Sequence, residues 1–90
     1  MRIKVAGFVD NAMVTEEFEL SVPEGSTVKK VMSLADKSGK MKRPVIKKIM
    51  RMPRPPTVLL NGTGLDIPGG LSSKVNEGDE LAVMTPVAGG

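Results

Sequence analysis

The chain has 90 residues, of which 40% are hydrophobic and 26% charged, and its formal net charge is +3. This is the composition of one globular domain with a single modest core. It contains neither cysteine nor histidine, which excludes thiol nucleophiles, imidazole bases and most transition-metal sites. No apolar run approaches the roughly 20 residues of a membrane span, and the first residues follow a strand pattern rather than that of a signal peptide. We therefore expect a cytoplasmic protein.

Two strands open the chain. Residues 2–9 alternate between apolar residues on one face and, on the other, Arg2, Lys4 and Phe8. Residues 13–22 alternate again, and the intervening Asp10-Asn11 pair favours a turn. The two strands are therefore predicted to form a hairpin. Their inward-facing residues would be Ile3, Val5, Val9, Phe18, Leu20 and Val22.

A helix is predicted next. Apolar residues recur at three-and-four spacing from Val28 to Ala35. Ser26 or Thr27 is placed to cap the first turn, and Gly39 to end the helix in the left-handed conformation. The buried face would consist of Val28, Val31, Met32 and Ala35.

Residues 40–56 form a basic segment, which carries seven Lys and Arg residues and no acid. Four prolines interrupt it, and the first, Pro44, predicts a short helix through Met50. The charge suits either nucleic-acid phosphates or an acidic partner protein, but no aromatic residue is interleaved for base stacking. We interpret the segment as a surface that tunes association with a partner. The residues assigned to partner binding are Lys47, Lys48, Arg51 and Leu59.

The last third predicts further strands. Residues 57–60 form a strand that ends in an Asn61-Gly62 turn, and residues 71–75 form a short strand or helical turn. Residues 80–84 form a final strand, which is well placed to enter beside the first. The fold class is α+β, with a mixed sheet of four to five strands and one main helix packed on one face. The predicted core includes Val5, Phe18, Leu20, Val31, Leu59, Leu81 and Val83.

No catalytic or metal-binding motif emerges. The glycines of residues 61–64 and 68–70 lack the spacing of a phosphate loop and suit turns. Strand alternation separates Glu16 from Glu17 and Glu19, so these acids do not converge. Nothing resembles a nucleophile, a base and an orienting group. We therefore expect no catalytic residue and no metal site.

The C-terminal region carries a resemblance. The turn and strand "GDELAV" (78–83), followed by "PVAGG" (86–90), resemble the ubiquitin-like sulfur carriers, which include the small subunit of molybdopterin synthase and the thiamine-pathway sulfur carrier (MoaD/ThiS type). "VLLNG" (58–62) is also similar to a segment of that family. The basic segment and Thr85, where the molybdopterin type often has proline, depart from the pattern. The resemblance implies a β-grasp domain over residues 1–84 and a flexible, extended Gly-Gly tail over residues 85–90.

The resemblance also implies a mechanism. The carboxylate of Gly90 would be adenylated by a ubiquitin-activating-type adenylyltransferase (MoeB/ThiF-like) that binds ATP and Mg²⁺, so this chain itself would hold no cofactor. A sulfur donor would then yield a thiocarboxylate, which a synthase subunit accepts for molybdopterin or tungstopterin, thiamine or tRNA thiolation. The protein would thus be a carrier and not an enzyme. The residues that would thread the partner's channel are Pro86, Val87, Ala88, Gly89 and Gly90.

Three alternatives stay open. A modifier of the same fold would transfer its activated Gly90 to lysines of target proteins. A binding module would use residues 40–56 to hold RNA or an acidic partner. A regulatory or structural β-grasp domain would have an inert tail. Terminal glycines favour the first alternative over the other two, because a tail without Cβ atoms can enter a narrow channel.

Overall fold

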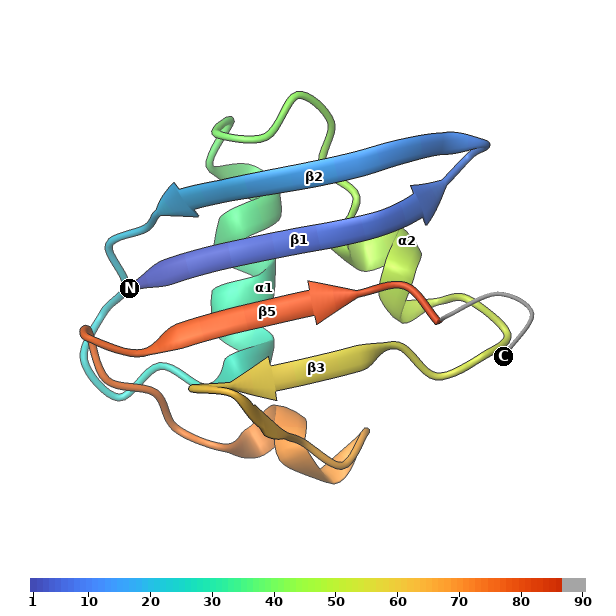
Figure 1. Ribbon diagram of the computed structural model, residues 1–90. Helices are drawn as coiled ribbons and strands as arrows, with labels where there is room; N and C mark the ends of the chain where they lie inside the picture. The colour runs from blue at the N-terminus through green and yellow to red at the C-terminus, as the bar shows by residue number, and fades with distance from the viewer. Residues whose placement is uncertain (87–90) are drawn as a thin grey trace.

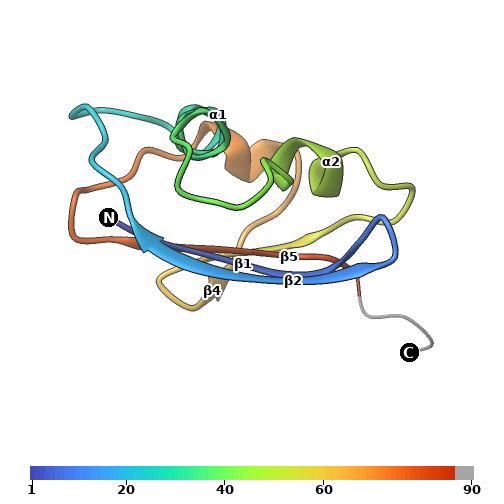
Figure 2. The ribbon, with the colours of Figure 1, turned by 90° about the horizontal axis from the view of Figure 1, so that it is seen from above.

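The computed structural model describes residues 1–86 of the chain. One sheet contains β1 (Arg2–Val9), β2 (Ala12–Glu19), β3 (Thr57–Leu60), β4 (Thr63–Gly64) and β5 (Glu80–Met84). The helices are α1 (Val28–Lys37), α2 (Ile46–Met50) and a short 3-10 helix, η1 (Gly69–Ser72). Figure 1 looks onto the sheet, and Figure 2 shows α1 and α2 on the same face of it. Among residues 1–86, no helix is long and apolar enough to cross a membrane.

The strand order is β2-β1-β5-β3-β4, which places the last strand in the middle of the sheet. β5 is parallel to β1 and antiparallel to β3, as the arrows of Figure 1 show. This confirms the predicted α+β class, the mixed sheet and the entry of the closing strand beside the first. Because β5 has neighbours on both sides, its last residues are held in register by β1 and β3.

The β1–β2 hairpin confirms the predicted turn. Asp10 and Asn11 have φ values of 53° and 63°, a conformation that favours short polar side chains and closes two-residue hairpins. β2 ends at Glu19, three residues earlier than predicted. The ladder stops there because Glu19 lies opposite Arg2, the first residue of β1. The Leu20 N–H still donates to the Met1 carbonyl at 2.8 Å.

Helix α1 begins and ends where its caps were predicted. The Thr27 hydroxyl accepts a hydrogen bond from the Lys30 N–H at 3.2 Å, which makes Thr27 rather than Ser26 the N-cap. Gly39 follows the helix at φ 74°. The buried residues are the predicted four, Val28, Val31, Met32 and Ala35.

Helix α2 confirms the predicted short helix but begins two residues after Pro44, at Ile46. Its N-terminus is capped by a residue distant in the sequence. The Asp36 carboxylate accepts hydrogen bonds from the Ile46 N–H at 3.0 Å and the Lys47 N–H at 2.9 Å. Since Asp36 lies in α1, this contact ties the two helices together and fixes the start of α2.

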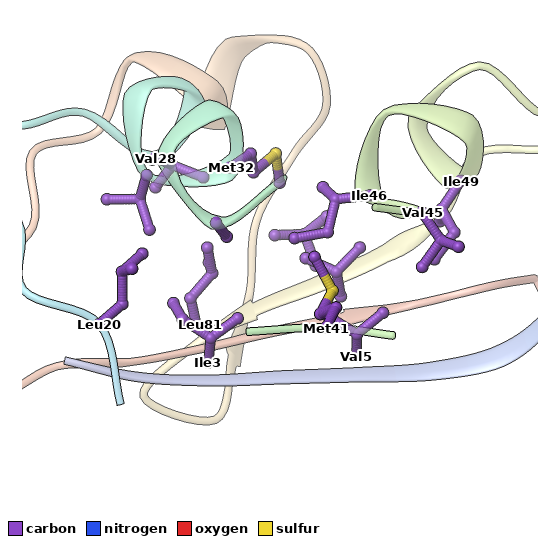
Figure 3. Packing of buried hydrophobic residues seen from close by; sticks show 14 of the residues in the cluster. Ile3, Val5, Leu20, Val28, Met32, Met41, Val45, Ile46, Ile49 and Leu81 are labelled. Carbon is purple, nitrogen blue, oxygen red and sulfur yellow. The ribbon is translucent and has the colours of Figure 1, made fainter. Parts of the chain in front are cut away.

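The core lies between the sheet and the helices. Figure 3 shows aliphatic and methionine side chains from α1, α2 and the inner face of the sheet meeting there. Ile3, Val5, Val28, Ile46, Ile49 and Leu81 are among the fully buried residues. The region of Leu71–Val75 contains the end of η1, an isolated bridge from Lys74 to Thr27 and the buried Val75.

Two of the predicted core residues differ. Phe18 packs against the core but is only partly buried, because β2 is an edge strand. The assignment of Leu59 to the core is wrong. In β3 the neighbouring Val58 is buried, and strand alternation turns Leu59 to the opposite face, where it pairs with Ala82.

Candidate functional site

The face of the sheet that the helices leave uncovered has two chemically different halves. At the start of β1, Arg2 lies 3.0 and 3.2 Å from Glu19 and Glu17. Lys4 lies 3.5 Å from both Glu17 and Glu80. These exposed pairs satisfy one another's charge at the N-terminal end of β1. The opposite end of the same face has no such network among residues 1–86 and is apolar.

An apolar groove lies at that opposite end. Phe8 on β1 and Met13 on β2 are directly paired across the hairpin, with exposed fractions of 62% and 61%. The groove encloses about 920 Å³ and is open to solvent. Exposed large apolar side chains gathered in one place mark a surface that contacts another molecule. The residues that line this tail-base groove are Ala6, Gly7, Phe8, Met13, Thr15, Met52, Pro53, Arg54, Met84, Thr85 and Pro86.

Thr85, the first residue of the predicted tail, is hydrogen-bonded to β1 at the edge of this groove. β5 ends at Met84, yet the Thr85 N–H still donates to the Ala6 carbonyl at 3.0 Å. The Thr85 hydroxyl accepts a hydrogen bond from the Phe8 N–H at 3.2 Å. Both groups of Thr85 therefore bind β1 on either side of Gly7. The contact sets the direction in which the chain leaves the sheet.

Gly7 is what allows this approach. It has a φ of 138°, and a Cβ on Gly7 would overlap the Thr85 side chain. Glycine adopts this backbone conformation without the steric cost that other residues meet. Gly7 thus leaves the space that the Thr85 side chain occupies.

Of the residues predicted to thread the partner's channel, the structure describes only Pro86. Pro86 lines the tail-base groove, directly after the Thr85 contact. Val87, Ala88, Gly89 and Gly90 lie outside the described residues. The division into a domain of residues 1–84 and a tail of residues 85–90 stays a prediction, with the addition that Thr85 is hydrogen-bonded to the domain.

The residues predicted to bind a partner do not form one cluster. The Lys48 ammonium lies 2.7 Å from the Asp10 carboxylate, and Arg43 lies 3.7 Å from the same group. The hydrogen bond and charge of Lys48, with a smaller contribution from Arg43, lower the pKa of Asp10. Lys47 and Arg51 are exposed at the two ends of α2, and Leu59 lies on the opposite side of the sheet from α2. Lys48 therefore contributes to a contact within the chain.

Sequence reasoning missed the residues of the tail-base groove apart from Pro86. Phe8 was placed on the outward face beside two charged residues, and a large aromatic at an outward strand position was itself the available signal. Met13, Met52 and Met84 gave no such signal. The pairing of β2, β1 and β5 brings Met13 and Met84 together, and the segment after α2 adds Met52. Within residues 1–86, no group of three metal-ligating side chains converges.

The fold and the groove define the class of protein. A mixed sheet with a central last strand, one main helix on its face and a C-terminal segment leaving beside an apolar surface is the β-grasp architecture of ubiquitin-like proteins. The model of the ThiS family matches residues 5–90. The chain therefore belongs to the ThiS family, whose members are small ubiquitin-like sulfur carriers rather than catalysts.

Solved structures agree on the fold. In the complex of subunits 1 and 2 of molybdopterin-converting factor from Helicobacter pylori 26695, one chain matches with 18% identity, a TM-score of 0.53 and full coverage of both chains. SAMP1 from Haloferax volcanii matches with 20% identity, a TM-score of 0.62 and full coverage of both chains. Urm1 from Trypanosoma brucei has 21% identity and a TM-score of 0.54, over 99% of this chain and 95% of that one. No curated protein sequence matches the chain significantly.

Proposed function

We propose that the protein carries sulfur as a thiocarboxylate on Gly90. The observation that carries the proposal is the ThiS-family match, which extends through residue 90 and includes the Gly-Gly motif. A C-terminal carboxyl group has a reference pKa of about 3.3–3.7, so it is ionised at neutral pH and is a poor acyl electrophile. It must be activated before sulfur can be added.

The activation takes place in two steps on a partner enzyme. A carboxylate oxygen of Gly90 attacks the α-phosphorus of ATP, and pyrophosphate leaves. Sulfide then attacks the acyl carbon, AMP leaves and the thiocarboxylate forms. ATP and Mg²⁺ bind the partner, and this chain supplies the acyl group and the surface that positions it. Gly89 and Gly90 suit a narrow channel because they have no Cβ atom.

The tail-base groove is the proposed docking surface for the activating enzyme. It combines exposed apolar side chains with the point at which the tail leaves the sheet, so a partner seated there would receive the tail directly. Three of its residues are methionines, whose flexible side chains adapt to differently shaped partners. A carrier needs this property, because it must bind an activating enzyme and afterwards a sulfur-accepting subunit.

The test is intact mass spectrometry of the full chain after incubation with the cognate activating enzyme, ATP and sulfide. The proposal predicts that one oxygen is exchanged for sulfur at the C-terminus, and that omission of ATP abolishes the exchange. A chain that is adenylated but becomes attached by an amide bond to lysines of other proteins, with no thiocarboxylate, would instead be a protein modifier. A chain that is never adenylated would contradict the proposal.

A further inference from the structure

A second groove lies on the other side of the molecule, between α1, α2 and η1. It encloses about 410 Å³. Its floor is apolar and its rim is cationic, and we call it the helix-face groove. The floor residues are Met32, Ile46, Met50 and Leu71, and the rim lysines are Lys29, Lys37 and Lys47.

The charge of the rim is available to a ligand. Lys29, Lys37 and Lys47 are exposed, and none of them has an ion-pair partner among residues 1–86. The remaining charged residue of the lining is Asp36. Both oxygens of its carboxylate already accept N–H groups at the start of α2. The groove therefore presents three cations around one anion that is engaged within the fold.

The floor is accessible as well as apolar. Met50 and Leu71 are partly exposed, while Met32 and Ile46 below them belong to the buried core. A ligand that covered Met50 and Leu71 would remove apolar surface from water, which favours binding roughly in proportion to the area covered. The occupant must therefore offer apolar side chains toward the floor and negative charge toward the rim.

We propose that the helix-face groove docks an acidic, amphipathic segment of a partner protein. Such a segment places its apolar residues on one side and its carboxylates on the flanks, which matches an apolar floor with a lysine rim. A nucleic acid matches the rim but not the floor, since no aromatic residue lines the groove for base stacking. The lysine rim would bind the carboxylates of this segment, and Lys47 is the rim lysine that comes from the basic segment.

The two grooves lie on opposite faces of the sheet. Figure 2 shows the helices on one side, and the residues of the tail-base groove on β1, β2 and β5 alternate toward the other side. A partner in the helix-face groove would leave the tail-base groove open. The proposal does not depend on the chemistry at Gly90, because it rests on residues of α1, α2 and η1 alone.

A designed peptide serves as the probe. It carries leucines at helical i, i+3 and i+7 positions and glutamates on the flanks, and a scrambled peptide of the same composition is its control. Amide chemical shifts of the isotopically labelled protein report where the probe binds. We expect shifts at Lys29, Ser33, Lys47 and Leu71, with Phe8 and Met13 unmoved.

Two charge-reversed variants test the rim. Lys29→Glu with Lys47→Glu removes two rim cations, and Lys30→Glu with Lys74→Glu makes the same change of net charge outside the groove. Lys29 and Lys30 both lie in the first turn of α1, and Lys47 lies in the first turn of α2, where acidic residues are tolerated. The rim variant should bind the probe about tenfold more weakly at low salt, and the control pair should change binding by less than about twofold.

Met50→Gln tests the floor and should also weaken binding while urea melts show a folded protein. The proposal is overturned if the probe shifts the Phe8 and Met13 amides instead, if it does not bind, or if both lysine pairs weaken binding equally. It is also overturned if a single-stranded RNA oligonucleotide binds the groove more tightly than the peptide.

Discussion

At the scale of single residues, the contact between Gly7 and Thr85 decides how the tail leaves the domain. The paired residues of β1 and β5 end at Ala6 and Met84. The next residue, Thr85, still binds β1 through one backbone and one side-chain hydrogen bond. Gly7 provides the space for both. A substitution in β1 therefore acts on the base of the tail, even though the two residues are 78 positions apart in the chain.

Gly7→Ala should destabilise the fold by about 2–5 kcal/mol, the sum of backbone strain and overpacking. Gly25→Ala is the matched control, since Gly25 also has a positive φ, 81°, but has open space around it. It should cost about 1–2 kcal/mol. Adding Thr85→Ala to Gly7→Ala should recover part of the loss. Urea denaturation compares these three variants with the unmodified protein. Equal losses of unfolding free energy for Gly7→Ala and Gly25→Ala would disprove the contact.

Asp79 joins two turns at the opposite end of the molecule. Its carboxylate accepts hydrogen bonds from the Asn61 side chain at 3.0 Å and from the Asn76 N–H at 2.8 Å. These bonds, the Asn61 contact first, lower the pKa of Asp79 because they favour the charged form. The group therefore contributes stability that is complete above the ordinary aspartate pKa of about 3.9 and is lost as pH falls through the lowered folded-state value.

Asp79→Asn should lower stability at neutral pH and flatten the decline of stability below about pH 4. Urea melts over a pH series provide the measurement. Asp66→Asn is the control, since the Asp66 carboxylate has no hydrogen-bond or ion-pair partner within the described part of the chain. If Asp66→Asn flattens the acid limb as much as Asp79→Asn does, the link between the two turns does not explain the pH dependence.

At the scale of elements, strand alternation predicted most of the sheet but not which side of β3 faces the helices. In β1 the charged residues Arg2 and Lys4 identify the outer face, so the buried residues follow directly. The strand "TVLL" has no charged residue, and either face could be the inner one. The pairing of Val58 with Val83 settles it. The consequence is that Leu59 stands beside Ala82 on the uncovered face.

Adjacent residues of β3 test this assignment. Val58→Ala should destabilise the protein by roughly 1–3 kcal/mol, because it empties space in the core. Leu59→Ala should cost less than about 1 kcal/mol, although it removes more atoms, because a partly exposed side chain leaves no closed cavity. Midpoints of urea denaturation compare the two. A larger loss of stability for Leu59→Ala than for Val58→Ala would show that Leu59 belongs to the core after all.

Local patterns also predicted the caps of α1 and the turns at Asp10-Asn11 and Asn61-Gly62, since each depends on residues close together in the chain. The Asp36 cap of α2 could not be predicted, because it joins residues ten and eleven positions apart across an irregular segment. The tail-base groove was beyond reach for the same reason. Its lining comes from β1, β2, β5 and the Met52–Arg54 segment, which only the folded sheet brings together.

At the scale of the whole molecule, the sheet separates two surfaces of different chemistry. The tail-base groove is apolar and lies where the chain leaves β5, whereas the helix-face groove is rimmed with lysines. Phe8→Glu should weaken binding to the activating enzyme by about thirtyfold or more, the effect of a central apolar contact. Ser21→Glu adds the same charge at an exposed position outside both grooves and should leave this binding unchanged. Calorimetric titration measures the affinity of each variant for the activating enzyme. Equal affinities would show that the tail-base groove is not part of the docking surface.

If Gly90 is the reactive residue, its deletion should abolish sulfur loading. Deletion moves the carboxylate back by roughly 3.3–3.6 Å, and acyl transfer requires reacting atoms within about 3–3.5 Å. The deleted chain and Gly89→Val should remain folded and should compete with the unmodified protein for the activating enzyme. Intact mass after incubation with enzyme, ATP and sulfide should show sulfur on the unmodified chain and on neither variant. Conversion of the deleted chain at the rate of the unmodified one would show that Gly90 is not the reactive residue.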